Sequence, residues 1–215
     1  MSHHKRPILI GVAGPSGSGK SLLVDNLHKT LHEDFSVSII REDSYYLDQS
    51  HIDPVDRPKK NYDHPDALEH DLLVEHLKTL KNNEAVNIPV YKFHTHTRGE
   101  ETQYVPPAQI ILCDGILLLA DKNIRKELDV TVFIDAPLDI CLIRRLNRDL
   151  SERGRSIQNT LDQYVETVRP MYWEFIAPSK EGVNHIVTGG GKNWDAIDSI
   201  KQDIIEKMKQ IESGA

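Results

Sequence analysis

Residues 11–21 read Gly-Val-Ala-Gly-Pro-Ser-Gly-Ser-Gly-Lys-Ser, and this stretch decides the fold. Residues 14–21 match the pattern G-x-x-x-x-G-K-[ST], a loop whose backbone N–H groups surround the phosphates of a nucleotide. In such a loop the lysine reaches the β- and γ-phosphates, and the final hydroxyl can bind Mg²⁺. The residues that we expect to contact phosphate are Gly14, Pro15, Ser16, Gly17, Ser18, Gly19, Lys20 and Ser21.

The sequence on both sides of this loop favours a nucleotide site over an ordinary glycine turn. Residues 7–13 are nearly all apolar, as in a buried strand, and residues 21–31 carry apolar side chains at helical spacing. A strand, a glycine-rich loop and a helix N-terminus together form an anion site, because the N–H groups of the first helical turn have no partner within the helix.

The rest of the chain alternates between strand and helix patterns. Four more apolar stretches are expected to be core strands, at residues 35–40, 109–114, 130–135 and 185–188. Apolar spacing predicts further helices at residues 67–80, 116–128, 138–151, 161–175 (kinked or broken at Pro170) and 194–211. We therefore predict an α/β fold of the phosphate-loop type, with a five-stranded parallel sheet covered by helices on both faces. Residues 87–105 predict a small β-hairpin outside this sheet.

Length and composition fit one domain that spans residues 1–215, with 39% hydrophobic and 27% charged residues. The net charge of −7 argues against broad nucleic-acid binding. No apolar stretch reaches the length of a membrane span, and the N-terminus lacks a signal pattern, so we expect a cytoplasmic protein without membrane contact. Cys113 and Cys141 lie among apolar residues and are expected to be buried and reduced.

Two acidic residues follow core strands at the edge where open α/β sheets bind ligands. Asp114 ends an apolar strand and precedes a glycine, which is the place of a magnesium-ordering acid in phosphate-loop enzymes. With Ser21 it makes up the predicted metal site. Asp43 follows the second strand, where a carboxylate can take the proton of an attacking hydroxyl. For each residue alone, a structural or solvated carboxylate remains an alternative.

A dense group of arginines occupies residues 144–155. On a helix, Ile140, Ile143, Leu146 and Leu150 share one face and leave Arg145 and Arg148 on the other. A solvated charged face is the simplest interpretation. Because the whole chain is acidic and a further Arg-Gly-Arg sequence follows, we favour a lid over residues 144–160 that closes on phosphates and excludes water.

Taken together, these stretches closely resemble the uridine kinase (uridine–cytidine kinase) family from about residue 8 to residue 193. Besides the phosphate loop, the resemblance lies in five ordered motifs, at residues 43–46, 61–67, 89–98, 144–155 and 178–180. It implies a nucleoside-binding insertion at about residues 43–106 and a nucleoside as substrate. It also implies ATP or GTP as the donor with Mg²⁺, a homotetramer and inhibition by CTP.

The resemblance also implies roles for individual residues. Asp43 would be the general base on the ribose 5′-hydroxyl, beside Tyr46, and Lys20 and Arg148 would complete the catalytic set. The other implied roles are Asp63 and Arg145 on the 2′- and 3′-hydroxyls, Tyr62 and Tyr91 on the pyrimidine ring, His96 and Arg155 on its edge, Arg148 and Arg153 on the triphosphate, Gln163 near the site, and residues 189–193 near adenine.

Four features of the sequence need separate comment. Tyr91 and His96 have opposite parity, so a straight strand cannot direct both at one base and a bend is required. Asp114 stands where the family usually has Glu, and residues 181–185 differ from the usual Tyr-Ala-Asp pattern. His94 and His96 resemble a metal pair, but no third ligand is placed near them, so we favour base contact.

The preferred hypothesis is phosphorylation of the 5′-hydroxyl of uridine and cytidine in pyrimidine salvage. A related kinase that acts on another small alcohol, such as pantothenate or ribulose phosphate, would lack the pyrimidine-contacting set. A regulatory GTPase should carry an Asn-Lys-x-Asp motif, and the sequence has none. A nucleotide-sensing module would keep the phosphate loop without needing Asp43 as a base.

Overall fold

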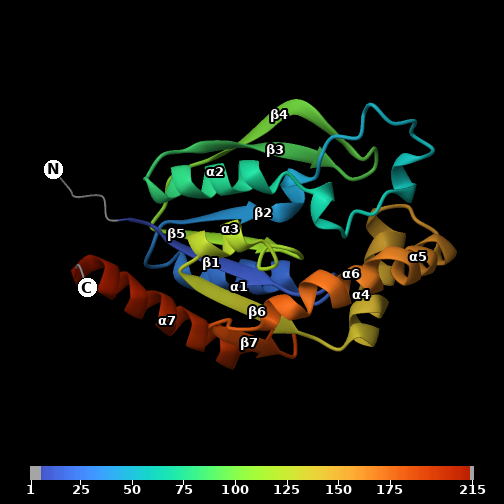
Figure 1. Ribbon diagram of the computed structural model, residues 1–215. Coiled ribbons are helices and arrows are strands. Elements are labelled where there is room, and N and C mark those ends of the chain that lie inside the picture. The colour runs from blue at the N-terminus through green and yellow to red at the C-terminus, as the bar shows by residue number, and fades with distance from the viewer. Residues whose placement is uncertain (1–5, 214–215) are drawn as a thin grey trace.

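The computed structural model describes residues 6–213, and a five-stranded sheet lies at its centre (Figure 1). In spatial order the strands are β2 (Val37–Arg41), β5 (Ile110–Gly115), β1 (Ile8–Ala13), β6 (Val130–Asp135) and β7 (His185–Thr188). All neighbouring pairs are parallel, so the carboxyl ends of the strands meet at one edge. The predicted α/β fold with its parallel five-stranded sheet is confirmed.

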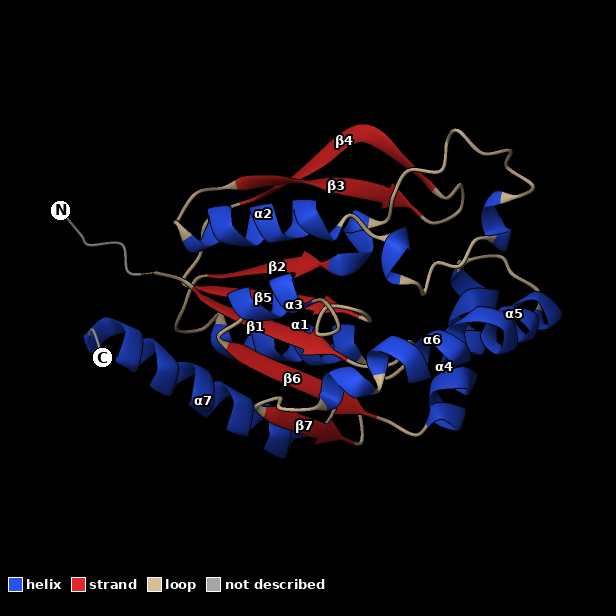
Figure 2. Cartoon of the chain, viewed as in Figure 1, coloured by secondary structure: helices blue, strands red, loops and turns tan. Residues whose placement is uncertain are grey.

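Helices cover both faces of the sheet, as Figure 2 shows. Along β1, Ile8, Ile10 and Val12 belong to one hydrophobic core and Leu9 and Ala13 to the other, because successive side chains of a strand point to opposite faces. The first core includes residues of α1 (Lys20–Leu31) and α7 (Trp194–Ser213). The second includes residues of α2 (His70–Lys81) and α3 (Lys122–Glu127).

Two smaller parts flank the carboxyl edge. The antiparallel strands β3 (Val86–Lys92) and β4 (Thr97–Val105) form the expected hairpin outside the main sheet. The helices α4 (Leu138–Glu152) and α5 (Ile157–Gln163) lie beyond the ends of the strands in Figure 1. Short 3₁₀ turns occur at Glu42–Tyr45, Arg57–Lys59, Pro65–Ala67 and Pro178–Lys180.

The helix predicted over residues 116–128 is wrong for its first half. Residues 116–119 are four consecutive apolar residues that are all buried, so they form an irregular segment inside the core and have no solvent-facing side. The helix begins only at Lys122, because Asp121 accepts hydrogen bonds from the N–H groups of Asn123 and Ile124 and caps it.

The prediction for Pro170 is a kink or a break, and the helix does not break there. The backbone stays helical through Arg169–Met171 (α6), between two π-helical segments, Tyr164–Val168 and Tyr172–Ile176. The N–H of Arg169 donates to the carbonyl of Tyr164, five residues earlier. This wider turn changes the hydrogen-bond ladder just before Pro170, whose missing N–H would leave a gap in a regular α-helix.

Two other expectations can be compared directly. Cys113 and Cys141 are buried and free, as predicted. Within residues 6–213, no helix is long and apolar enough to cross a bilayer.

Candidate active site

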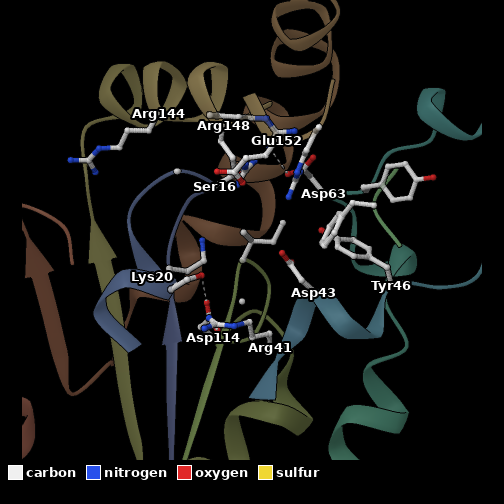
Figure 3. A pocket seen from close by; sticks show the side chains of 18 of the residues that line it. Ser16, Lys20, Arg41, Asp43, Tyr46, Asp63, Asp114, Arg144, Arg148 and Glu152 are labelled. Carbon is white, nitrogen blue, oxygen red and sulfur yellow. Dashed lines mark hydrogen bonds and ion pairs between the residues drawn. The ribbon is translucent and has the colours of Figure 1, made fainter. Parts of the chain in front are cut away.

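A cavity of about 400 Å³ opens at the carboxyl edge of the sheet, between the phosphate loop, the hairpin and α4 (Figure 3). Its lining includes most of the residues that the sequence predicts as a site. These are Ser16, Gly17, Gly19, Lys20, Ser21, Asp43, Tyr46, Tyr62, Asp63, Tyr91, His96, Asp114, Arg145, Arg148, Arg153, Arg155 and Gln163. Gly14, Pro15 and Ser18 belong to the same loop but do not line the cavity.

The phosphate loop connects β1 to α1 and depends on glycine at two close approaches. Gly17 (φ 82°) lies against the backbone of Cys141, and Gly19 (φ 99°) lies against Gly191, so a side chain at either position would be strained. The Lys20 ammonium donates to the carbonyl oxygens of Gly14 and Pro15, both at 3.0 Å. Burial lowers the pKa of Lys20, although the nearby carboxylates of Asp114 and Asp43 oppose this effect.

Asp114 forms a polar cluster at the foot of this loop. One carboxylate oxygen accepts a hydrogen bond from the Ser21 hydroxyl at 2.7 Å, and the other accepts one from Arg41 at 2.9 Å. Arg41 also donates to Asp25 at 2.8 Å. Burial raises the pKa of Asp114, while Arg41 and Ser21 oppose the rise.

The Ser21–Asp114 pair has the chemistry of a magnesium site. Hydroxyl and carboxylate oxygens are the hard ligands that Mg²⁺ prefers, and the ion commonly takes only one or two from the protein and the rest from phosphates and water. No group of three or more His, Cys, Asp or Glu residues suited to a metal exists within residues 6–213. His94 and His96 therefore do not form part of such a group.

Asp43 belongs to the 3₁₀ turn that directly follows β2. Its half-buried carboxylate points into the cavity between Lys20 and Tyr46 (Figure 3). Among the described residues, no side chain or backbone group forms a hydrogen bond with it. The carboxylate is thus free to accept a proton from a bound hydroxyl.

Aromatic side chains form the far wall of the cavity. The rings of Tyr62 and His96 are stacked, with centroids 4.6 Å apart, and the Tyr91 hydroxyl lies 3.4 Å from His96 Nδ1. His96 lies in the turn between β3 and β4 with φ 55°, and the strand register shifts between Pro89 and Tyr91. The chain therefore bends, as the parity of Tyr91 and His96 requires. Burial and three nearby arginines lower the pKa of His96 to about 4, so the ring is neutral at pH 7.

Asp63 and Arg145 meet at the side of the cavity next to α4. Their charged groups are 3.8 Å apart, and both side chains are 5% exposed. Arg145 also donates to Ser16 Oγ at 3.0 Å and to Gln163 Oε1 at 2.8 Å. Burial raises the pKa of Asp63, and the charge of Arg145 opposes the rise.

Similarity to known proteins identifies the family of this chain. Residues 9–194 match the model of the Phosphoribulokinase / Uridine kinase family. The chain belongs to this family. It is 48% identical over 206 residues to a uridine kinase of Haemophilus influenzae, which covers 94% of this chain and 97% of the relative. It is 50% identical over 200 residues to the uridine kinase of Salmonella paratyphi B, which covers 92% and 94%.

Solved structures of low identity share the fold of this family member. Phosphoribulokinase from Rhodobacter spheroides aligns with a TM-score of 0.62 at 15% identity, over 88% of this chain and 73% of that one. D-glycerate 3-kinase from Cryptococcus neoformans aligns with a TM-score of 0.59 at 19% identity, over 87% and 89%. Membership of this family implies a nucleotide as the phosphoryl donor.

One central residue of the site escaped the sequence reasoning. Asp149 is fully buried, and four arginines surround its carboxylate: Arg148 at 3.0 Å, Arg155 at 3.1 Å, and Arg145 and Arg153 at 3.7 Å. Burial alone would raise its pKa, but the four charges outweigh burial and lower it. Its sequence position, four residues after Arg145 and four before Arg153, was the available signal.

The apolar face of α4 points away from the site. Ile140, Ile143 and Leu150 are 38%, 54% and 40% exposed, whereas Arg145 and Asp149 are buried. The grouping of side chains on two faces was predicted, but the polar face is the one that faces the protein. Residues that also line the cavity without having been predicted are Leu22, Arg41, Phe93, Gly115, Ile116, Arg144 and Glu152.

Proposed function

We propose that the protein transfers the γ-phosphoryl group of ATP or GTP to the 5′-hydroxyl of uridine and cytidine. The observation that carries this proposal is that one cavity holds both a phosphate loop and an aromatic pocket, with the Asp43 carboxylate between them. The similarity to curated uridine kinases over most of the chain supports the same substrate class.

In the proposed reaction the nucleoside lies in the aromatic pocket with its 5′-hydroxyl at Asp43. As the bond from O5′ to the γ-phosphorus forms and the bond to the β-phosphate oxygen breaks, the hydroxyl proton passes to Asp43, and a nucleoside diphosphate leaves. Lys20 and Arg148 stabilise the negative charge that spreads over the transferred group. Arg153 would contact the triphosphate beside them.

The sugar and base are proposed to be recognised by the polar side chains of the pocket. Asp63 can accept hydrogen bonds from the 2′- and 3′-hydroxyls, and Arg145 stabilises that carboxylate. The neutral ring of His96 can form a hydrogen bond to the edge of a pyrimidine, and so can the guanidinium group of Arg155. The ring of the pyrimidine is enclosed by Tyr62, Tyr91 and Tyr46. Gln163, which bonds both Arg145 and Arg155, fixes the two guanidinium groups relative to each other.

Ser21 and Asp114 would hold Mg²⁺ with the nucleotide. The ion, when bound, neutralises charge on the β- and γ-phosphate oxygens.

The proposal also includes assembly as a homotetramer. The exposed apolar side chains of Ile140, Ile143 and Trp173 support this assembly, and light scattering measures the oligomeric state directly.

The deciding experiment supplies purified protein with MgATP and a panel of nucleosides and small alcohols. We expect monophosphates from uridine and cytidine, and much less from adenosine or 2′-deoxyuridine. Product from ribulose phosphate, glycerate or pantothenate in place of the pyrimidine nucleosides would overturn the proposal, as would the absence of any product.

A further inference from the structure

Glu42 directly precedes Asp43, but its side chain points into the protein rather than into the cavity. It is fully buried. One carboxylate oxygen, Oε1, lies 3.1 Å from Nε2 of His70, and the other, Oε2, accepts the backbone N–H of Leu117 at 3.0 Å. A buried carboxylate is costly unless its oxygens are paired, and here both are.

His70, the first residue of α2, extends the network to a second carboxylate. Its Nδ1 lies 3.2 Å from Oδ2 of Asp121, whose other oxygen caps α3. Each ring nitrogen faces a carboxylate oxygen, and a protonated ring can donate to both. Burial would lower the pKa of His70, but Glu42 and Asp121 outweigh burial and raise it.

Gly115 shows how closely the network approaches the site. A Cβ atom at Gly115 would collide with the side chain of Glu42, so only glycine leaves room for this carboxylate. Gly115 follows Asp114 at the end of β5, and Leu117 lies two residues further on. Glu42 thus connects the turn that carries Asp43 to the segment that follows Asp114.

We infer that Glu42 and His70 are positioning residues, which hold the Asp43 carboxylate at a fixed place relative to Asp114 and the phosphate loop. This inference rests on the proposed phosphoryl transfer. Such a network can fix the position of a reacting group. This matters because a displacement of about 1 Å at that group can lower the rate about 100-fold. Stability is a weaker reason, because buried ion pairs often stabilise a fold no better than apolar residues of similar volume.

Two substitutions of His70 separate the two halves of the network. In His70→Gln the amide nitrogen takes the place of Nε2 and keeps the bond to Glu42. In His70→Asn the amide nitrogen takes the place of Nδ1, so the bond to Asp121 is kept and the bond to Glu42 is lost. We expect kcat for uridine to fall about 10- to 100-fold in His70→Asn and to stay within about threefold in His70→Gln. The Kd values for uridine and ATP should change less than about threefold in both variants.

A double-substitution cycle tests whether the effect acts through Asp43. In an Asp43→Asn background there is no base left to position, so His70→Asn should cause little further loss of kcat. The matched control is His185→Asn, because His185 forms a similar pair with Asp203 at 2.9 Å and neither residue lines the cavity. It should lower the melting temperature without lowering kcat.

Hydrogen exchange provides a readout that does not depend on turnover. The amides of residues 42–46 and of Leu117 should exchange faster in His70→Asn than in His70→Gln. If His70→Asn does not fold, Glu42→Gln takes its place, since it keeps an acceptor for Leu117 and loses the charge that pairs with His70.

The outcomes are distinct. A wild-type protein that phosphorylates no pyrimidine nucleoside contradicts the proposed function and leaves the exchange experiment to decide the inference. An active wild-type protein with equal kcat in His70→Asn and His70→Gln overturns the inference alone. Losses that multiply in the Asp43→Asn background would likewise overturn it.

Discussion

Replacing Asp149 by Asn should loosen the whole group of arginines at the cavity. The substitution keeps the size of the side chain but removes the charge that four guanidinium groups share. Removing one partner of a buried ion pair lowers the free energy of unfolding by about 3–5 kcal/mol. Arg148, Arg153 and Arg155 are 30%, 21% and 20% exposed and can turn toward water, so we expect the lower end, about 3 kcal/mol. For a chain of this length the melting temperature should fall by about 6–12 °C.

Urea unfolding followed by tryptophan fluorescence measures the loss of stability in Asp149→Asn. Steady-state kinetics measure the effect of the substitution on the site. We expect kcat/KM for ATP to fall about tenfold, because the predicted triphosphate ligands lose the carboxylate that holds them. The matched control is Asp162→Asn on the neighbouring helix α5, where, within residues 6–213, the side chain of the exposed Asp162 bonds only Gln158. It should leave both measurements unchanged.

The pH dependence follows from the lowered pKa of Asp149. A carboxyl group whose pKa is lower in the folded than in the unfolded protein contributes stability that is complete above the unfolded pKa, about 3.9. This contribution is lost as the pH falls through the folded pKa. The free energy of unfolding should therefore differ between wild type and Asp149→Asn by the same amount at pH 7 and pH 5. This difference should shrink below about pH 4. A difference under about 0.5 kcal/mol at pH 7, with unchanged kinetics, would refute the reasoning.

Three further predictions concern the proposed reaction. Lys20→Ala should abolish turnover in a protein that still shows a native circular dichroism spectrum, and near-normal turnover would exclude the phosphate-loop role. Asp43→Asn should lower kcat about 10²–10⁴-fold with nearly unchanged Kd for both substrates; a collapse of affinity with unchanged kcat would make Asp43 a binding residue only. Uridine should exceed 2′-deoxyuridine in kcat/KM by about 10-fold or more, because the buried Asp63 loses a partner at a cost of about 1–3 kcal/mol, and equal values would remove Asp63 from the sugar site.

Local patterns allowed much of the fold to be predicted. The phosphate loop and its flanking strand and helix follow from residues 7–31 alone, because turn, strand and helix signals are all local there. The segment 116–119 misled the helix prediction because burial on every side removes the periodicity that separates helix from irregular structure. The helix does not break at Pro170 because a π turn, which has no clear sequence signal, precedes the proline.

The site was predictable only in part, and for a related reason. Residues in recognisable motifs, such as Asp43 and His96, were expected at one cavity, and the structure places them there. Asp149 and Glu42 bind no substrate in the proposed mechanism and hold other side chains instead. The role of Glu42 depends on His70, which is 28 residues away, and no spacing rule connects two such positions.

The contacts of Lys20 with the carbonyls of Gly14 and Pro15 link the end of its side chain to the first residues of the phosphate loop and help to hold the shape of the loop. Contacts within the protein thus contribute to ordering this loop during folding, before the nucleotide binds. An arriving triphosphate has only to exchange two carbonyl contacts of one ammonium group for its own oxygens. Affinity for the donor is then set by the difference between two sets of hydrogen bonds, and binding should order few additional backbone amides in this segment.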